Sequence, residues 1–131
     1  MIPRFIISLL QGRSPAVFGD GEQSRDFTYI DNVIQANLLA MSADHLHGEV
    51  LNIACGERTS LNQLLEVLKG MVGSEISALY QPSREGDVRH SFADVRKAKE
   101  VLGYVPCVDP AEGLRKTVEY FRGQPDHGII E

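Results

Sequence analysis

The chain of 131 residues has no tryptophan, two cysteines and only 7% aromatic residues. Cys55 and Cys107 form no CxxC pair, so the sequence predicts reduced thiols and neither a metal site nor a disulfide framework. No apolar run approaches the roughly 20 residues that span a bilayer. We therefore expect a cytoplasmic protein with no membrane partner.

An excess of basic charge is also lacking. The chain has 13 Lys and Arg residues against 18 Asp and Glu residues, which gives a formal net charge of -5. Because nucleic-acid binding requires clustered basic residues, we expect no nucleic-acid partner. The hydrophobic content of 43% is typical of a globular domain that buries a core.

Two motifs of redox enzymes are missing. Gly19 and Gly21 are not followed by the third glycine of a dinucleotide fingerprint, and no tyrosine has a lysine four residues later. A Tyr and Lys pair on one helical face is one way to lower a phenol pKa for proton transfer. The sequence therefore assigns no catalytic and no cofactor-binding residue to this chain.

Apolar spacing and capping residues predict alternating helices and strands. The expected helices cover about residues 2–10, 31–41, 61–72, 95–103 and 110–122, and the expected strands cover 16–18, 27–30, 49–54 and 76–80. Asp31, Ser60, Asp94 and Asp109 are the expected N-caps, with Ser60 and Gln63 forming a capping box. This alternation indicates a mixed α/β fold in which 49–54 belongs to a larger sheet.

Two arginines stand beside glycine turns and acidic residues. Arg25 follows the turn at 19–21 and precedes Asp26, which is placed to orient it, and Arg84 is followed three residues later by Asp87. An arginine fork suits a diphosphate because it forms two parallel charge-assisted hydrogen bonds. The alternative is a pair of surface salt bridges, Arg25 with Asp26 and Arg84 with Glu85.

The runs VFGDGEQSRDFTYIDNVIQANLLAM and REGDVRHSFADVRKAKEVLGYVP carry a family resemblance. They resemble the carboxyl-terminal, substrate-binding part of extended short-chain dehydrogenase/reductases of the NAD-dependent nucleotide-sugar epimerase/dehydratase family. The likeness covers essentially the whole chain and is nearest to the UDP-N-acetylglucosamine 4-epimerase branch. It implies a small mixed α/β domain that lacks the N-terminal Rossmann half. Residues 1–122 would form the nucleotide-sugar-binding domain, and residues 123–131 a polar tail.

The resemblance assigns roles at the phosphate and sugar end of the ligand. It implies that Arg25 and Arg84 bind the diphosphate of a UDP-sugar and that Asp87 reaches the ribose. Ser91 replaces a bulky residue of related hexose epimerases, so it would leave room for an N-acetyl group at C2 of the sugar.

The resemblance also assigns residues at the base. Ala16 to Phe18 would lie along the uracil ring and pair with its edge through main-chain groups. Ile2 and Pro3 would flank the base. This set completes the substrate-binding residues expected from the sequence.

The chemistry implied by the family is a 4-epimerisation in which NAD removes hydride from C4 and returns it to the other face of the sugar. NAD would bind the full-length enzyme, and this chain would hold the nucleotide. Alone, we expect it neither to bind NAD appreciably nor to turn over sugar. A dehydratase, a decarboxylase, an epimerase of another nucleotide sugar and a stand-alone binding module remain alternatives.

Apolar faces that a missing Rossmann half would cover predict self-association of the chain. The opening helix and residues 49–54 are the expected exposed faces, and the resemblance implies a homodimer for the full-length enzyme. The second predicted helix carries an apolar stripe of Val33, Ile34, Leu38 and Met41.

Overall fold

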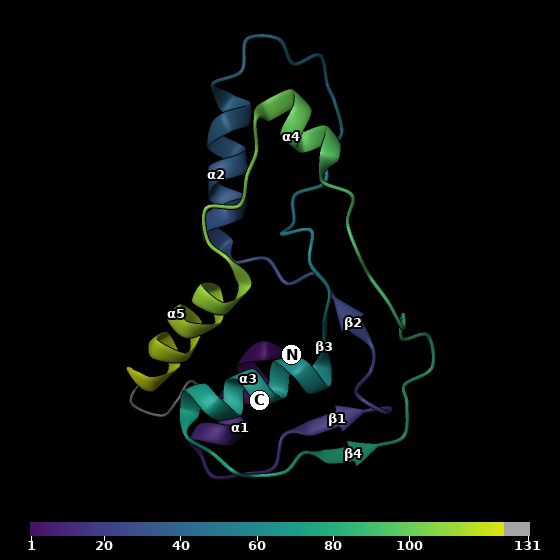
Figure 1. Ribbon diagram of the computed structural model, residues 1–131, viewed down its shortest axis with the longest axis vertical. Coiled ribbons are helices and arrows are strands. Elements are labelled where there is room, and N and C mark those ends of the chain that lie inside the picture. The colour runs from purple at the N-terminus through teal and green to yellow at the C-terminus, as the bar shows by residue number, and fades with distance from the viewer. Residues whose placement is uncertain (125–131) are drawn as a thin grey trace.

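The computed structural model describes residues 1–124, which form a wide body and a narrower arm (Figure 1). The body contains α1, α3, α5 and four short strands, and the arm contains α2, α4 and the connecting residues 42–58. The elements in chain order are α1 Ile2–Leu10, β1 Ala16–Phe18, β2 Ser24–Arg25, α2 Ile30–Met41, β3 Thr59–Ser60, α3 Leu61–Val72, β4 Leu79–Gln81, α4 Arg96–Leu102 and α5 Pro110–Arg122.

The core of the body lies among α1, α3 and α5. Phe5 and Ile6 of α1 are 3% and 0% exposed, and they pack in one cluster with Leu64 and Leu68 of α3 and Val118 of α5. The helical pattern predicted for α1 is therefore confirmed. The expectation that this helix presents an exposed apolar face is wrong, because α3 and α5 of the same chain cover it.

The strands form two small sheets. β1 pairs in parallel with β4, with Ala16 opposite Leu79, and β2 pairs antiparallel with β3, with Ser24 opposite Ser60. The strand predicted at 27–30 is wrong, because the ladder bonds fall at Ser24–Arg25 and the chain then runs unpaired into α2. The fourth strand begins later than predicted, at Leu79.

The strand predicted at 49–54 is also wrong, because no described strand lies beside this segment to complete a ladder. A strand requires a neighbour for its backbone hydrogen bonds, which apolar composition alone does not supply. Val50 in this segment is 83% exposed.

Two of the predicted N-caps are confirmed. The Ser60 hydroxyl accepts from the backbone N–H of Gln63 at 3.2 Å, and the Ser60 N–H donates to the Gln63 side chain at 2.9 Å. The Asp109 carboxylate accepts from the N–H of Glu112 at 2.8 Å and opens α5. These contacts satisfy helix N–H groups that have no partner within the helix.

The other two predicted N-caps are wrong. Tyr29 is the N-cap of α2, so Asp31 lies in the first turn, where its carboxylate binds Lys116 of α5 at 3.0 Å. Val95 is the N-cap of α4, and Asp94 instead accepts from the N–H of Arg96 and pairs with its guanidinium at 2.6 Å. In both cases a nearby cation binds the carboxylate.

The arm has a small core. Ala36 of α2, Ala98 of α4 and Tyr104 form it, and the Tyr104 hydroxyl donates to the carbonyl of Ala54 at 3.1 Å. Asn32 is fully buried, and its side-chain amide donates to and accepts from the backbone of Val108 at 2.8 and 2.9 Å. The arm is thus held to the chain before α5.

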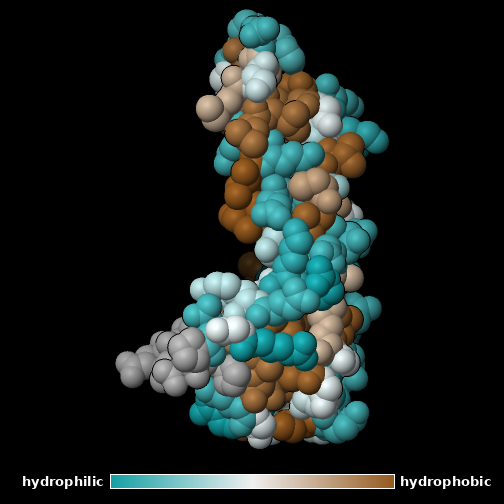
Figure 2. All heavy atoms as spheres, turned by 90° about the vertical axis from the view of Figure 1, so that its left-hand side faces the viewer, coloured by the Kyte–Doolittle hydropathy of each residue, from teal (hydrophilic) through white to brown (hydrophobic). Residues whose placement is uncertain are grey.

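The predicted stripe of α2 lies largely on the solvent side of this core. The exposed fractions on this side of α2 are 57% for Ile30, 49% for Ile34, 57% for Leu38 and 83% for Met41. Figure 2 shows a brown apolar band along this side of the arm. We name these four residues the α2 stripe.

α5 ends at Arg122, and residues 125–131 of the predicted polar tail lie outside the described residues. Cys55 and Cys107 are free thiols, as predicted. Within residues 1–124, no helix has both the length and the apolar character needed to cross a membrane.

Candidate functional site

The two predicted motifs meet at the junction of β2 and the loop after β4. The Arg25 guanidinium donates to the Asp87 carboxylate at 2.7 Å and to the carbonyl of Ser24 at 2.8 Å. The salt bridge between Arg25 and Asp26 that stood as the alternative is wrong. Asp26 instead accepts from the backbone N–H groups of Cys55 and Gly56, at 3.0 and 3.1 Å, and does not orient Arg25.

Arg84 stacks on an aromatic ring. Its guanidinium carbon lies 3.7 Å from the centroid of Phe18, on β1. No ion pair with Glu85 occurs among the described residues, so this alternative is wrong too. The two arginines are therefore held in different ways, Arg25 by a carboxylate and Arg84 by a π face.

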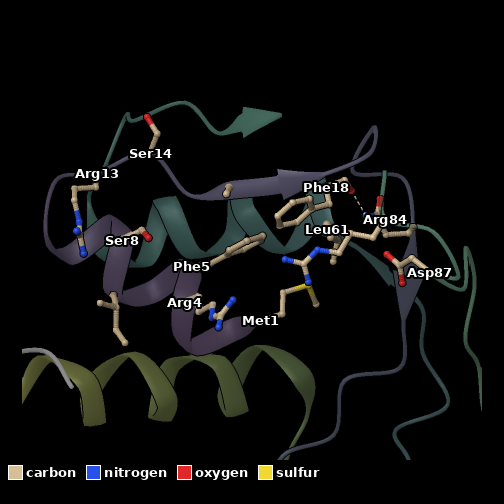
Figure 3. A pocket seen from close by; sticks show the side chains of 13 residues that line it. Met1, Arg4, Phe5, Ser8, Arg13, Ser14, Phe18, Leu61, Arg84 and Asp87 are labelled. Atoms are coloured by element: carbon tan, nitrogen blue, oxygen red, sulfur yellow. Dashed lines mark hydrogen bonds between the residues drawn. The ribbon is translucent and has the colours of Figure 1, made fainter. Parts of the chain in front are cut away.

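A cavity of about 530 Å³ lies between α1, β1 and the loop that carries Arg84 and Asp87 (Figure 3). Ala16 and Phe18 of β1, two of the residues expected beside a base, line it. Arg25 is not among the lining residues but reaches the cavity wall through its bond to Asp87. The structure thus brings five of the predicted residues to one place.

Three of the predicted residues lie elsewhere. Ile2 packs against the body core, and neither it nor Pro3 lines the cavity. Ser91 is exposed, and its N–H donates to the Ser24 carbonyl at 3.0 Å outside the cavity wall. At this end of the chain the cavity is instead lined by Met1 and by residues 4, 5, 7 and 8 of α1.

Arg4 and Arg13 also line the cavity, and neither was predicted from the sequence. The Arg4 guanidinium makes no hydrogen bond or ion pair with any residue of 1–124, and the Arg13 guanidinium donates to the Gln11 side chain. The one signal for Arg4 was its place beside Phe5 in the first turn of the predicted helix. Arg13 follows the end of α1, where the sequence offers no comparable signal.

The electrostatics of the cavity favour an anion. Arg4, Arg13 and Arg84 line it against one carboxylate, Asp87, which Arg25 already binds. Since guanidinium groups stay charged and form forked bonds to phosphate, the arrangement suits a phosphorylated ligand. Phe5 and Phe18 add an aromatic wall that suits a planar group.

The glycine turn before β2 is fixed by a second ion pair. The Arg89 guanidinium donates to Asp20 at 3.0 Å. Two hydrogen bonds hold the pKa of the Asp20 carboxyl below its ordinary value. The larger effect comes from the backbone N–H of Glu22, and the smaller from the Arg89 guanidinium. Beside them, the Ser24 hydroxyl and His90 Nδ1 are 2.9 Å apart. Residues 20–25 and 87–91 therefore form one hydrogen-bonded wall next to the cavity.

Residues 1–54 match the family model described as "NAD dependent epimerase/dehydratase family". UDP-glucose 4-epimerase of Mycolicibacterium smegmatis is 39% identical over 120 residues, which are 92% of this chain and 38% of that protein. UDP-glucuronic acid decarboxylase 1 of Xenopus tropicalis is 33% identical over 127 residues, which are 97% of this chain and 30% of that protein.

Solved structures agree with these relatives. A UDP-glucose 4-epimerase of Thermotoga maritima with UDP-glucose has a TM-score of 0.86 at 48% identity, over 90% of this chain and 38% of its own. A UDP-N-acetylglucosamine 4-epimerase of Methanobrevibacter ruminantium, in complex with UDP-N-acetylmuramic acid, has a TM-score of 0.88 at 38% identity, over 95% and 39%. A UDP-glucuronic acid 4-epimerase of Bacillus cereus, with UDP-glucuronic acid and NAD, has a TM-score of 0.86 at 33% identity, over 92% and 39%.

These similarities place the chain in the NAD-dependent epimerase/dehydratase family, whose members here are extended short-chain dehydrogenase/reductases. The chain is a small mixed α/β unit that spans about two fifths of the length of the Mycolicibacterium relative and of the three solved structures, at 38% or 39% of each. The resemblance predicted from the two arginine motifs is confirmed.

Proposed function

We propose that the chain binds the nucleotide part of a UDP-sugar and acts as the substrate-holding portion of an NAD-dependent 4-epimerase. The observation that carries this proposal is the cavity with three arginines and an aromatic wall, joined to Arg25 through Asp87. Solved relatives with UDP-glucose and UDP-glucuronic acid support the ligand class.

The roles follow the geometry. Arg84 would donate to the diphosphate from the loop, with Arg25 at the neighbouring wall. Asp87 would accept from the ribose diol, and Ala16 to Phe18 would face the base. Ser91 lies outside the cavity. It would therefore leave room for an N-acetyl group only if the sugar of the ligand extends out of the cavity toward it.

The contribution to catalysis would be orientation. A nucleotide gripped at its phosphates and base leaves the sugar free to turn about the phosphate link while the reacting carbon stays in reach. When NAD is bound in the full-length enzyme it supplies hydride transfer. Among residues 1–124 no helix starts directly after a glycine-rich turn that follows a strand, so we assign no residue of this chain to NAD.

A nucleotide-sugar decarboxylase is the second candidate, because the Xenopus decarboxylase matches 97% of this chain. The two activities share the nucleotide grip and differ in the sugar. Titration of the chain with UDP, UDP-N-acetylglucosamine and UDP-glucuronic acid would compare them. A clear preference for UDP-glucuronic acid would favour a uronic-acid enzyme, either a decarboxylase or a 4-epimerase like that of Bacillus cereus, over a UDP-N-acetylglucosamine 4-epimerase.

The test of the nucleotide site is calorimetric titration of UDP into the 131-residue protein. We expect binding that Arg84→Glu and Arg25→Glu each weaken at least about tenfold, because each reversal opposes a charged hydrogen bond. Arg96→Glu is the control, since Arg96 pairs with Asp94 on the arm. Equal affinities in all four proteins, or no binding in any, would contradict the proposal.

A turnover assay tests the division of labour. We propose that this chain alone, with NAD and UDP-N-acetylglucosamine, forms no C4 epimer. NMR of the sugar anomeric protons would detect the product. Epimer formed by the purified chain would show that the reacting groups lie within these residues.

A further inference from the structure

The contact between Arg84 and Phe18 places two ligand-binding groups on top of each other. Both residues line the cavity, and Figure 3 shows the Arg84 side chain extended along the Phe18 ring into it. A guanidinium 3.7 Å from the ring centroid is at stacking distance, so it fills the space that a planar base would need on that face.

Arg84 has no stronger partner within the described chain. No hydrogen bond or ion pair holds its guanidinium, in contrast to Arg25, which binds Asp87 and the Ser24 carbonyl. A forked, charge-assisted bond to phosphate is stronger than an exposed cation–π contact. A phosphate placed in the cavity would therefore draw Arg84 away from the ring.

We infer that Arg84 works in two positions: it covers Phe18, and when it moves to a phosphate it opens that ring for the base of the same ligand. The inference rests on the proposed nucleotide function and adds a coupling between the two ends of the nucleotide. The base alone must displace the guanidinium without compensation. A nucleoside diphosphate brings the phosphate that removes it.

This coupling predicts opposite effects of one substitution on two ligands. In Arg84→Gln, uridine binds about two- to fivefold more tightly than in the unmodified protein, because the competing cation–π contact is gone. UDP binds about tenfold or more weakly, because the charged phosphate contact is lost. NMR titration suits uridine, and calorimetry suits UDP.

Two further measurements isolate the ring. Inorganic diphosphate, which has no base, should shift the Phe18 ring resonances of the unmodified protein but not those of Arg84→Gln. Arg84→Lys keeps the charge but only a weaker, non-planar cation–π contact, so its uridine and UDP affinities should both lie between those of the unmodified protein and Arg84→Gln. Arg96→Gln on the arm should leave both affinities unchanged.

The outcomes separate the two proposals. If the unmodified protein binds UDP and Arg84→Gln weakens UDP and uridine alike, or leaves uridine unchanged, the two-position role is wrong and the nucleotide site stands. If the unmodified protein binds neither UDP nor diphosphate, both proposals fail. Ring resonances that do not respond to diphosphate would also overturn the two-position role.

Discussion

The Arg25 guanidinium and the Asp87 carboxylate meet at 2.7 Å although 62 positions separate them in the sequence. Their side chains are 26% and 39% exposed, so the pair lies at the rim of the cavity rather than in the core. Asp87 therefore has two roles. It neutralises Arg25, and it is the only acidic residue among the described residues that line the cavity.

Substitution of that acidic group should separate phosphate binding from ribose binding. Asp87→Asn keeps the shape and removes a charge that repels anions, so we expect inorganic diphosphate to bind about three- to tenfold more tightly at low salt. UDP should gain less, since its ribose loses an ionised acceptor. Calorimetric titration measures both. Asp94→Asn is the control, and weaker diphosphate binding by Asp87→Asn would show that holding Arg25 in place matters more than repulsion.

Close packing of α5 against Tyr29 gives a stability prediction. A Cβ atom at Gly113 would lie 2.8 Å from Tyr29 Cβ, whereas one at Gly70 in α3 would meet nothing within 4 Å. We expect Gly113→Ala to lower the free energy of unfolding by about 1–3 kcal/mol through overpacking. Gly70→Ala should raise it by about 0.5–1 kcal/mol through helix propensity. Urea unfolding compares the pair, and stabilisation of both variants would contradict the close contact.

Alkaline pH should destabilise the arm through Tyr104. Burial, followed by the charges of Cys55, Cys107 and Asp26, raises the pKa of Tyr104 to about 12 from 10.0. Between these values the unfolded chain loses the phenolic proton and the folded chain keeps it, so the free energy of unfolding falls as pH rises above 10. Urea unfolding of the protein and of Tyr104→Phe across this range isolates the effect. A parallel pH dependence of the two proteins would contradict it.

The α2 stripe gives the prediction on assembly. Because the α2 stripe is a contiguous apolar row whose side chains are 49–83% exposed, we expect the isolated chain to self-associate through it. Ile34→Gln with Leu38→Gln should shift sedimentation toward the monomer. Val67→Gln, at an apolar position 41% exposed on α3, is the matched control. A monomeric unmodified protein would contradict the expectation.

The helices were predictable because their signals are local. The Ser60 and Gln63 capping box and the Asp109 cap lie within three residues of the groups they bind. The strands at 27–30 and 49–54 were mispredicted because a ladder depends on a distant neighbour, which composition does not reveal. Asp31 and Asp94 were misassigned as caps because Lys116 and Arg96 bind them instead.

The site was predictable by residue type and only partly by position. Arg25, Arg84 and Asp87 were named from the motifs, but the pairing of Arg25 with Asp87 follows from the fold. Ile2 and Pro3 were assigned to the base by resemblance, but the residues at this end of the chain that line the cavity are 1, 4, 5, 7 and 8. Arg4 could be assigned to the cavity only once the position of α1 beside it was known.

The small core of the arm has a consequence for unfolding. Three buried apolar residues form that cluster, Ala36 of α2, Ala98 of α4 and Tyr104 just after α4, whereas the body cluster has ten. Local opening costs least where least apolar surface is buried. Amide hydrogens of α2 and α4 should therefore exchange with solvent before those of α1, α3 and α5, so that the arm opens as a unit while the cavity of the body stays formed.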